Sequence, residues 1–299
     1  MGSKGAELRQ ERESMVKTWL ITGSGNGLGN EIAKSALAAG NYVIATARRP
    51  EQLRDLVDEY GDQVRAVKQD VTDEDQAQAA VRTALDAFGR LDIVVNNAGY
   101  SQFGAFEQLS DRDFKGIVDT CFYGVVYTTR AALPVMRKQR SGVIFQVSSV
   151  GGRITRAGNS SYHAAKWAVS GFSEALAQET KPFGVQVCAL EPGGIRTNWG
   201  KRAAENVADV LPEYADSVGR VLGMLDSYWG KENSDPRRNA ELIVKLADEK
   251  DLPAHLLLGS DAVRYSERAD HDRTALGEKW YPTSTSVDFG AGSMPHGDF

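Results

Sequence analysis

The sequence predicts an α/β fold: a single domain built on a doubly wound, Rossmann-like parallel sheet of seven strands in three α/β/α layers. Two patterns predict it, namely short runs of Val, Ile and Leu that alternate with helical stretches, and a glycine-rich turn between the first strand and the first helix. The chain has 299 residues, of which 41% are hydrophobic and 25% charged. This balance is typical of globular proteins, and one α/β sheet can extend over about 250 residues.

Seven apolar runs are predicted to be strands, at 18–21, 42–46, 64–69, 91–95, 143–147, 185–190 and 256–258. Their nearly continuous apolar content is typical of strands covered by helices on both faces. Helical patterns lie between them, at 28–39, 51–60, 73–88, 111–137 and 161–181. Gly89 and Pro182 end two of these helices, because glycine adopts a left-handed cap and proline has no backbone N–H. Ligands of such sheets bind beyond the carboxyl ends of the strands.

The two ends of the chain differ from this pattern. Residues 1–14 are polar and charged, which predicts a disordered leader, and the domain is expected over 15–260. Residues 261–299 form a C-terminal extension, whose Gly-, Ser- and Thr-rich end at 283–299 is expected to be mobile or to pack on a neighbour. Between the sixth and seventh strands, apolar residues recur at helical spacing over 207–229 despite Pro212, which predicts one or two amphipathic helices.

Charge and composition exclude several classes of partner. The net charge of −5 is unlike that of a nucleic-acid-binding protein, so no nucleic acid is expected. No apolar run reaches the length of a membrane span and no secretory signal is present, so no membrane partner and a cytoplasmic location are expected. Cys121 and Cys188 are expected to be free thiols. No metal is expected, because the histidines form no ligand-like pair; they are His163, His255, His271 and His296.

The glycine-rich turn directly follows the first predicted strand. It comprises Gly23, Ser24, Gly25, Asn26, Gly27, Leu28 and Gly29. Without a Cβ the turn lets a pyrophosphate approach the backbone, and the helix that follows offers unpaired N–H groups and a partial positive charge. The alternative is a merely structural loop, but the position between strand and helix favours an anion site.

The end of the second strand indicates which dinucleotide would bind. An NAD-binding protein commonly places Asp or Glu there, but this sequence has Ala47 and Arg48. A guanidinium at this point would pair with a 2′-phosphate, so NADP(H) is favoured and NAD(H) is the less favoured cofactor. The alternative is an arginine that simply reaches solvent at a strand end.

Several motifs agree in order and spacing with one family. They are TGSGNGLG at 22–29, Asp70-Val71, NNAG at 96–99, Ser149, Tyr162-x-x-x-Lys166 and PGGIRT at 192–197. Over about residues 16–260 the sequence resembles the short-chain dehydrogenase/reductase family in its compact, single-domain, NADP-dependent form. The resemblance implies an oxidoreductase that transfers a hydride between NADP(H) and a small-molecule carbonyl or secondary alcohol. It also implies a homodimer or homotetramer.

The resemblance assigns further residues to the cofactor. Asp70 and Val71 would flank the adenine. The segment Asn97, Ala98 and Gly99 would line the adenosine ribose, and the nicotinamide would be held by Pro192, Gly193, Ile195 and Thr197.

The expected catalytic residues are Tyr162, Lys166 and Ser149. Tyr162 and Lys166 are four residues apart, so both side chains lie on one helix face. Free tyrosine titrates near 10, too high for a good base at neutral pH, and the Lys166 charge is expected to lower the pKa of Tyr162. Lys166 would also reach the nicotinamide ribose. Ser149 would hydrogen-bond the substrate oxygen and position it.

Cys121 departs from the family pattern. The family usually has Asn at this position, where it helps to hold a water that relays protons to the lysine. In one interpretation the Cys121 carbonyl still binds the water and the relay works. In another the relay is impaired, and the protein is a slow enzyme, an altered variant or a cofactor-binding regulator. In a third, Cys121 is a small packed residue.

The substrate side carries weaker signals. By the resemblance, helices within about 198–235 would form a substrate lid, and the residues lining the pocket would be Tyr100, Phe103, Trp199 and Tyr228. These residues favour a hydrophobic ketone or aldehyde, although each could equally belong to the core. An epimerase or dehydratase with tightly held NAD is a weaker alternative, because such relatives usually have a larger substrate domain.

Overall fold

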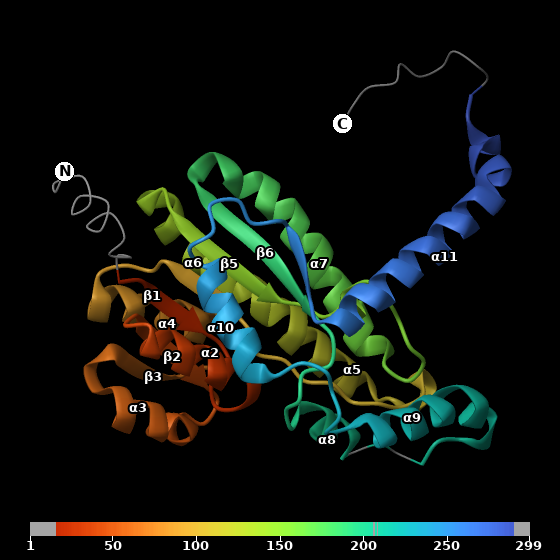
Figure 1. The fold of residues 1–299 in the computed structure, drawn as a ribbon, viewed down its shortest axis with the longest axis horizontal. Helices are drawn as coiled ribbons and strands as arrows, with labels where there is room; N and C mark the ends of the chain where they lie inside the picture. Colours follow the sequence, from red (N-terminus) through yellow and green to blue (C-terminus); the bar gives the residue numbers. More distant parts are fainter. Residues whose placement is uncertain (1–15, 206, 208, 290–299) are drawn as a thin grey trace, which may run out of the picture.

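A computed structural model describes residues 16–205, 207 and 209–289 of the chain. The predicted leader at 1–14 and the end of the extension at 290–299 lie outside the described residues. The described part forms one all-parallel sheet of seven strands in the order β3-β2-β1-β4-β5-β6-β7, which confirms the predicted fold class (Figure 1). The strands are β1 (Thr18–Ile21), β2 (Tyr42–Ala47), β3 (Val64–Lys68), β4 (Ile93–Asn96), β5 (Gly142–Val147), β6 (Val185–Pro192) and β7 (His255–Leu258).

Helices cover both faces of the sheet and bury its side chains in two apolar cores. Ile21 and Phe145 belong to the core under one set of helices, and Leu20 and Ile144 to the core under the other, because side chains alternate along a strand. The first face is covered by α2 (Gly27–Ala38), α3 (Arg54–Tyr60) and α10 (Pro236–Leu246). The second is covered by α4 (Glu74–Phe88), α6 (Gly124–Gln139) and α7 (Ser160–Thr180).

The winding of the sheet reverses between β1 and β4. Both β2 and β4 pair with β1, so the crossovers that leave the two sides of β1 run in opposite directions and a crevice opens at the carboxyl ends of β1 and β4. The amino ends of the same strands are closed. There the Asp92 carboxylate accepts hydrogen bonds from the Arg90 side chain and, at 2.9 Å, from the backbone N–H of Thr18. The crevice, not the closed edge, is therefore where a ligand would bind.

The long helix predicted at 111–137 is divided in the structure. It consists of α5 (Asp111–Val118), a π-helical turn at Asp119–Tyr123, and α6. A π-helical turn inserts one extra residue into the helix and often occurs at functional sites. Cys121 lies in the middle of this turn.

The segment between β6 and β7 contains the helical structure predicted over 207–229, but only after Pro212. The structure has α8 (Trp199–Ala204), a short 3-10 turn at Pro212–Tyr214, and a π-helical turn at Ala215–Gly219 that leads into α9 (Arg220–Tyr228). In this range helix begins only after Pro212 because proline cannot donate the hydrogen bond that a continuing helix requires.

The extension after β7 forms a helix that the sequence did not predict. Helix α11 (Ser260–Ser284) projects away from the body of the molecule (Figure 1). Only Asp261, Ala262 and Ser266 of this helix are buried, all near its start. Further out, Leu276 is 56% exposed and Trp280 is 51% exposed. No apolar stripe marked the helix in the sequence, because most of it does not pack on the domain.

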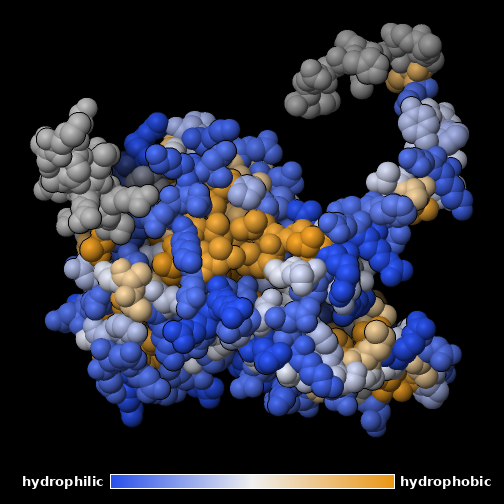
Figure 2. Space-filling view, viewed as in Figure 1, coloured by the Kyte–Doolittle hydropathy of each residue, from blue (hydrophilic) through white to orange (hydrophobic). Residues whose placement is uncertain are grey.

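The surface carries a hydrophobic area between α10 and α11, over β6 and β7 (Figure 2). Leu256 and Leu257 of the edge strand β7 are only partly buried. Among the described residues, no helix combines the length and the apolarity needed to cross a membrane.

The division into a packed core and a projecting helix can be tested by truncating one side chain in each. Ile144→Ala should lower the free energy of unfolding by about 2–5 kcal/mol, because Ile144 of β5 is fully buried beneath the helices that cover this face of the sheet. Leu276→Ala on α11 is the control and should cost less than about 0.5 kcal/mol. Urea unfolding measures both. A cost above about 1 kcal/mol for Leu276→Ala would show that the outer part of α11 packs against another molecule.

Candidate active site

One large cavity, of about 1060 Å³, opens at the carboxyl ends of the strands. It brings together most of the residues that the sequence predicted for the cofactor and substrate. Those that line it are Gly23, Gly25, Asn26, Gly27, Leu28, Arg48, Asp70, Val71, Asn97, Ala98, Gly99, Tyr100, Phe103, Ser149, Tyr162, Lys166, Pro192, Gly193, Ile195, Thr197, Trp199 and Tyr228. Ser24, Gly29 and Cys121 do not line the cavity but lie behind its wall.

The glycine-rich turn has the geometry of an anion-binding turn. Gly23 and Gly27 have φ values of +70° and +57°, which side chains with a Cβ rarely adopt. A Cβ on Gly29 would overlap the Asn97 amide nitrogen and the Gly23 carbonyl oxygen. Helix α2 has no acidic residue in its first turn, and the Asn26 side chain does not cap it. The first N–H groups of α2 are therefore available to a phosphate, and the turn fits a dinucleotide.

The end of β4 is fixed to this turn by hydrogen bonds. The Asn97 side chain donates to the Thr22 carbonyl oxygen at 2.9 Å. The Thr22 hydroxyl accepts from the backbone N–H groups of Asn97 and Ala98, at 3.0 and 3.1 Å. Sequence reasoning did not include Thr22 among the site residues, although its place at the end of β1 inside the glycine motif is a usable signal.

Arg48 lies at the adenosine end of the cavity, directly after β2. Its side chain is exposed, and within the described part of the chain no carboxylate forms an ion pair with it. Asp70, on the neighbouring strand end, accepts hydrogen bonds from the backbone and hydroxyl of Thr72. The guanidinium charge of Arg48 is therefore available to an anionic ligand.

Ser149, Tyr162 and Lys166 meet in the middle of the cavity. Ser149 follows β5 and accepts a hydrogen bond from the Gly151 N–H at 3.0 Å. Tyr162 and Lys166 lie on the first two turns of α7, and the Lys166 ammonium is 5.5 Å from the centre of the Tyr162 ring. The same ammonium donates to the Val147 carbonyl oxygen at 2.7 Å.

The pKa of Tyr162 is raised in the structure, not lowered as the Lys166 charge led us to expect. Burial raises the pKa of Tyr162 well above its ordinary value, because the phenolate would lose its hydration. The Cys121 thiol adds to the rise, and a hydrogen bond with Ser149 acts in the opposite direction. Burial also lowers the pKa of Lys166, because the ammonium loses its hydration.

Cys121 is fully buried beneath Gly99. Its thiol donates to the Tyr100 carbonyl oxygen at 3.3 Å. Burial raises the pKa of Cys121, and the nearby Lys166 charge partly offsets the rise. A Cβ on Gly99 would lie 3.3 Å from the Cys121 sulfur and 3.7 Å from the Lys166 nitrogen. Cys121 therefore sits directly behind the cavity, next to Lys166.

The outer end of the cavity is largely aromatic. Phe103 packs in one cluster with Leu225 and the rings of Tyr228 and Trp229. The Trp199 ring lies 5.3 Å from that of Tyr162. Sequence reasoning missed several polar residues that also line the cavity, namely Gln52, Arg156, Arg202, Glu232 and Asp261. They lie in segments without a motif and come close only in three dimensions.

His163 lines the cavity but has both ring nitrogens engaged. Its Nδ1 lies 2.8 Å from the Gly151 carbonyl oxygen, and its Nε2 accepts from the Arg156 N–H at 3.0 Å. Among the residues that the structure describes, no three His, Cys, Asp or Glu side chains are grouped so as to hold a metal ion.

Comparison with known proteins places this geometry in a family. The family model described as short chain dehydrogenase matches residues 17–208. "Oxidoreductase BOA17" from Botryotinia fuckeliana is 47% identical over 267 residues, which are 89% of this chain and 97% of that protein. A short-chain dehydrogenase structure from Streptomyces avermitilis has a TM-score of 0.85 and 39% identity, covering 92% of this chain and all of that one.

A third relative was solved with a cofactor. The 3-ketoacyl-(acyl-carrier-protein) reductase from Brucella melitensis, complexed with NADH, has a TM-score of 0.69 and 28% identity, over 81% of this chain and 96% of that one. The chain belongs to the short-chain dehydrogenase/reductase family and is an oxidoreductase that uses a nicotinamide cofactor.

Proposed function

We propose that the protein reduces a carbonyl group, or oxidises the corresponding secondary alcohol, with NADP(H) and with Tyr162 as the acid/base. The observation that carries the proposal is that Ser149, Tyr162 and Lys166 share one cavity with the glycine-rich turn. The bound cofactor supplies or accepts the hydride.

Each of the three side chains has a distinct role. Tyr162 donates the proton to the substrate oxygen during reduction, and its raised pKa keeps the phenol protonated throughout the neutral range. Ser149 donates a hydrogen bond to the same oxygen and fixes its position. The Lys166 ammonium stabilises the phenolate that forms when the proton leaves, and it orients the cofactor ribose. In the free protein Tyr162 is therefore in the protonated form, which is the form that reduction requires.

The preference for NADP(H) rests on Arg48. Its guanidinium lies at the end of β2, where a 2′-phosphate would come, and the adjacent Ala47 offers no carboxylate to bind a 2′-hydroxyl. The glycine-rich turn holds the pyrophosphate, Asp70 and Val71 border the adenine, and Asn97 to Gly99 border its ribose. Pro192, Gly193, Ile195 and Thr197 hold the nicotinamide.

The aromatic end of the cavity favours a hydrophobic ketone or aldehyde. Tyr100, Phe103 and Trp199 line this end, and α8 and α9 form the substrate lid. Reduction of a ketone agrees with the activity for which the Brucella melitensis relative, a 3-ketoacyl-(acyl-carrier-protein) reductase, is named. We further propose a homodimer or homotetramer, in which the partly buried leucines of β7 and the exposed face of α11 become covered.

A second candidate function is that of a cofactor-binding regulator with impaired catalysis. The observation that favours it is the burial of Cys121 beside Lys166, where the family places an asparagine. A thiol is a weak hydrogen-bond partner and would hold a relay water poorly.

Tyr162→Phe tests the acid/base assignment. Loss of the hydroxyl should lower kcat by more than about 100-fold while the Kd for NADPH changes less than about threefold, because the ring that borders the cofactor remains. The measurement is NADPH oxidation at about 340 nm, a cofactor absorbance, over a panel of ketones and aldehydes, with NADPH binding followed by fluorescence. Tyr123→Phe, on the outside of the π-helical turn, is the matched control. Substantial turnover by Tyr162→Phe would remove tyrosine from this role.

Arg48→Asp tests the cofactor preference. The variant should bind NADPH about 10–100-fold more weakly and should favour NADH, because a charge-assisted contact with the 2′-phosphate is replaced by repulsion. Dissociation constants for both cofactors measure the change, and Arg54→Asp on the exposed side of α3 is the control. An unchanged ratio would mean that another group contacts the 2′-phosphate.

Cys121→Asn separates the two candidate functions. Asparagine is close to cysteine in size and restores a strong hydrogen-bonding side chain beside Lys166. A retained relay predicts a kcat within about threefold of the parent, whereas an impaired relay predicts a gain of about tenfold or more. Steady-state kinetics over the same panel measure kcat, and NADPH affinity reports whether the site remains intact.

A further inference from the structure

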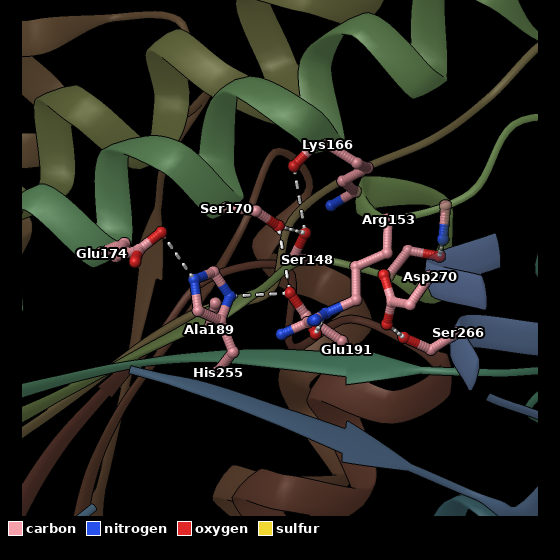
Figure 3. A network of polar contacts seen from close by, with 12 residues as sticks. Ser148, Arg153, Lys166, Ser170, Glu174, Ala189, Glu191, His255, Ser266 and Asp270 are labelled. Atoms are coloured by element: carbon pink, nitrogen blue, oxygen red, sulfur yellow. Dashed lines mark hydrogen bonds and ion pairs between the residues drawn. The ribbon is translucent and has the colours of Figure 1, made fainter. Parts of the chain in front are cut away.

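Glu191 is a fully buried carboxylate behind the proposed active site. It lies near the end of β6, directly before Pro192, and is 0% exposed. Isolated charges are rarely buried, because burial removes their hydration, unless several partners compensate. Figure 3 shows Glu191 at the centre of a polar network drawn from β6, α7, β7 and the loop after β5. No part of the proposed reaction chemistry uses it.

The contacts of Glu191 connect it to three other segments. Its Oε2 accepts from the Arg153 guanidinium, on the loop that follows Ser149. Its Oε1 accepts from the Ser170 hydroxyl at 3.2 Å and lies 2.8 Å from Nδ1 of His255. All three partners point toward the carboxylate in Figure 3.

Ser170 carries the connection on to the catalytic residues. Its hydroxyl lies 3.0 Å from that of Ser148. The single Ser148 hydroxyl proton can go either to Ser170 or, at 3.2 Å, to the Lys166 carbonyl oxygen. Ser148 is the neighbour of Ser149 in the chain, and Ser170 lies one turn after Lys166 on α7. One carboxylate therefore fixes the loop of Ser149 and the helix of Tyr162 and Lys166 relative to each other.

Gly152 shows independently how tightly these segments pack. A Cβ at Gly152 would lie 2.6 Å from the Ser170 hydroxyl and 2.8 Å from both the Lys166 carbonyl oxygen and the Ser148 hydroxyl. The loop after Ser149 thus contacts the same three groups that the Glu191 network joins, with no space for a side chain. A shift of the loop or of α7 would break this packing and the hydrogen bonds together.

We propose that Glu191 is a positioning residue for the reaction. It holds Ser149 and Lys166 in fixed positions relative to the Pro192–Gly193 turn that borders the cofactor. The inference rests on the proposed function for its kinetic consequence, but the network itself exists independently of turnover.

His255 makes the network sensitive to pH. Three charged groups face its ring: Glu191 from β6, Glu174 from α7 at 3.3 Å, and Arg153 from the loop. The hydrogen bond to Glu191 raises the pKa of His255 above its ordinary value, against an opposing effect of burial. A raised folded-state pKa gives stability that is fully present below the unfolded pKa of about 6.5 and is lost as the pH rises through the folded value. At lower pH, protonated His255 and Arg153 therefore both pair with the Glu191 carboxylate.

Glu191→Gln tests the proposal, because it keeps the size of the side chain and removes the charge. The kcat should fall by between about 10- and 100-fold, with KM and the Kd for NADPH within about threefold, since only the alignment of the reacting groups changes. Amide hydrogen exchange in the loop 148–153 should quicken. The control is Asp92→Asn, which breaks a comparable arginine pair at the closed, opposite edge of the sheet. It should alter neither kcat nor exchange in the loop.

The pH profile provides a readout that a purely structural role would not move. The kcat of the parent should decrease as the pH rises through the pKa of His255, and His255→Gln should abolish that step. Should Glu191→Gln not fold, Ser170→Ala removes the contacts of Ser170 with Glu191 and Ser148 but leaves Arg153 and His255 on the carboxylate. It should give the same loop exchange with a smaller loss of kcat.

The outcomes separate the two proposals. If the parent turns over no substrate in the panel, the proposed function fails, but the loop exchange of Glu191→Gln against Asp92→Asn still decides the positioning role. If Glu191→Gln retains kcat and loop exchange within about twofold of the Asp92→Asn control, Glu191 only stabilises the fold and the inference is overturned.

Discussion

The site depends on one close packing contact, between the glycine-rich turn after β1 and the end of β4. Gly29 leaves no space for a Cβ against Asn97 and the Gly23 carbonyl, and the Asn97 amide donates back to Thr22. This contact lies where the winding of the sheet reverses, so it fixes the floor of the crevice. The parallel register of the strands positions the other segments of the site. Because Val147 pairs with Leu190, the carboxyl ends of β5 and β6 lie at the same edge, where Ser149 follows β5 and Pro192 ends β6.

Sequence reasoning predicted the parts of the structure that follow from local sequence patterns. The strands and their order of appearance followed from apolar runs, and most predicted cofactor residues line one cavity because the carboxyl ends of parallel strands meet at one edge. It failed where the outcome depends on three-dimensional surroundings. Helix α11 has no apolar stripe along its length because only residues near its start are buried. The Glu191 network joins residues from four segments, and none of its members forms a motif with another.

The pKa of Tyr162 shows why a pair of charges cannot be judged from sequence spacing alone. Proximity to Lys166 favours the phenolate, but both groups are buried, and burial acts against each charge separately. Cys121 lies in the same enclosed region and adds a third ionisable group whose charged form is also disfavoured. In the free protein, Tyr162 and Cys121 therefore keep their protons. Any group that brings positive charge into the cavity would shift this balance towards the phenolate.

The projecting helix is connected to the site at its base. In its first turn, Asp261 accepts from the Gly194 N–H at 2.8 Å, directly after the Pro192–Gly193 turn. Three turns further, Arg273 donates to the Arg153 carbonyl oxygen at 2.7 Å and pairs with Asp270. The base of α11 thus contacts the segment after β6 and the loop after β5, while its outer part stays exposed. These contacts make the first turns of α11 part of the packing around the site, because they hold the two segments that carry Gly194 and Arg153 against one helix.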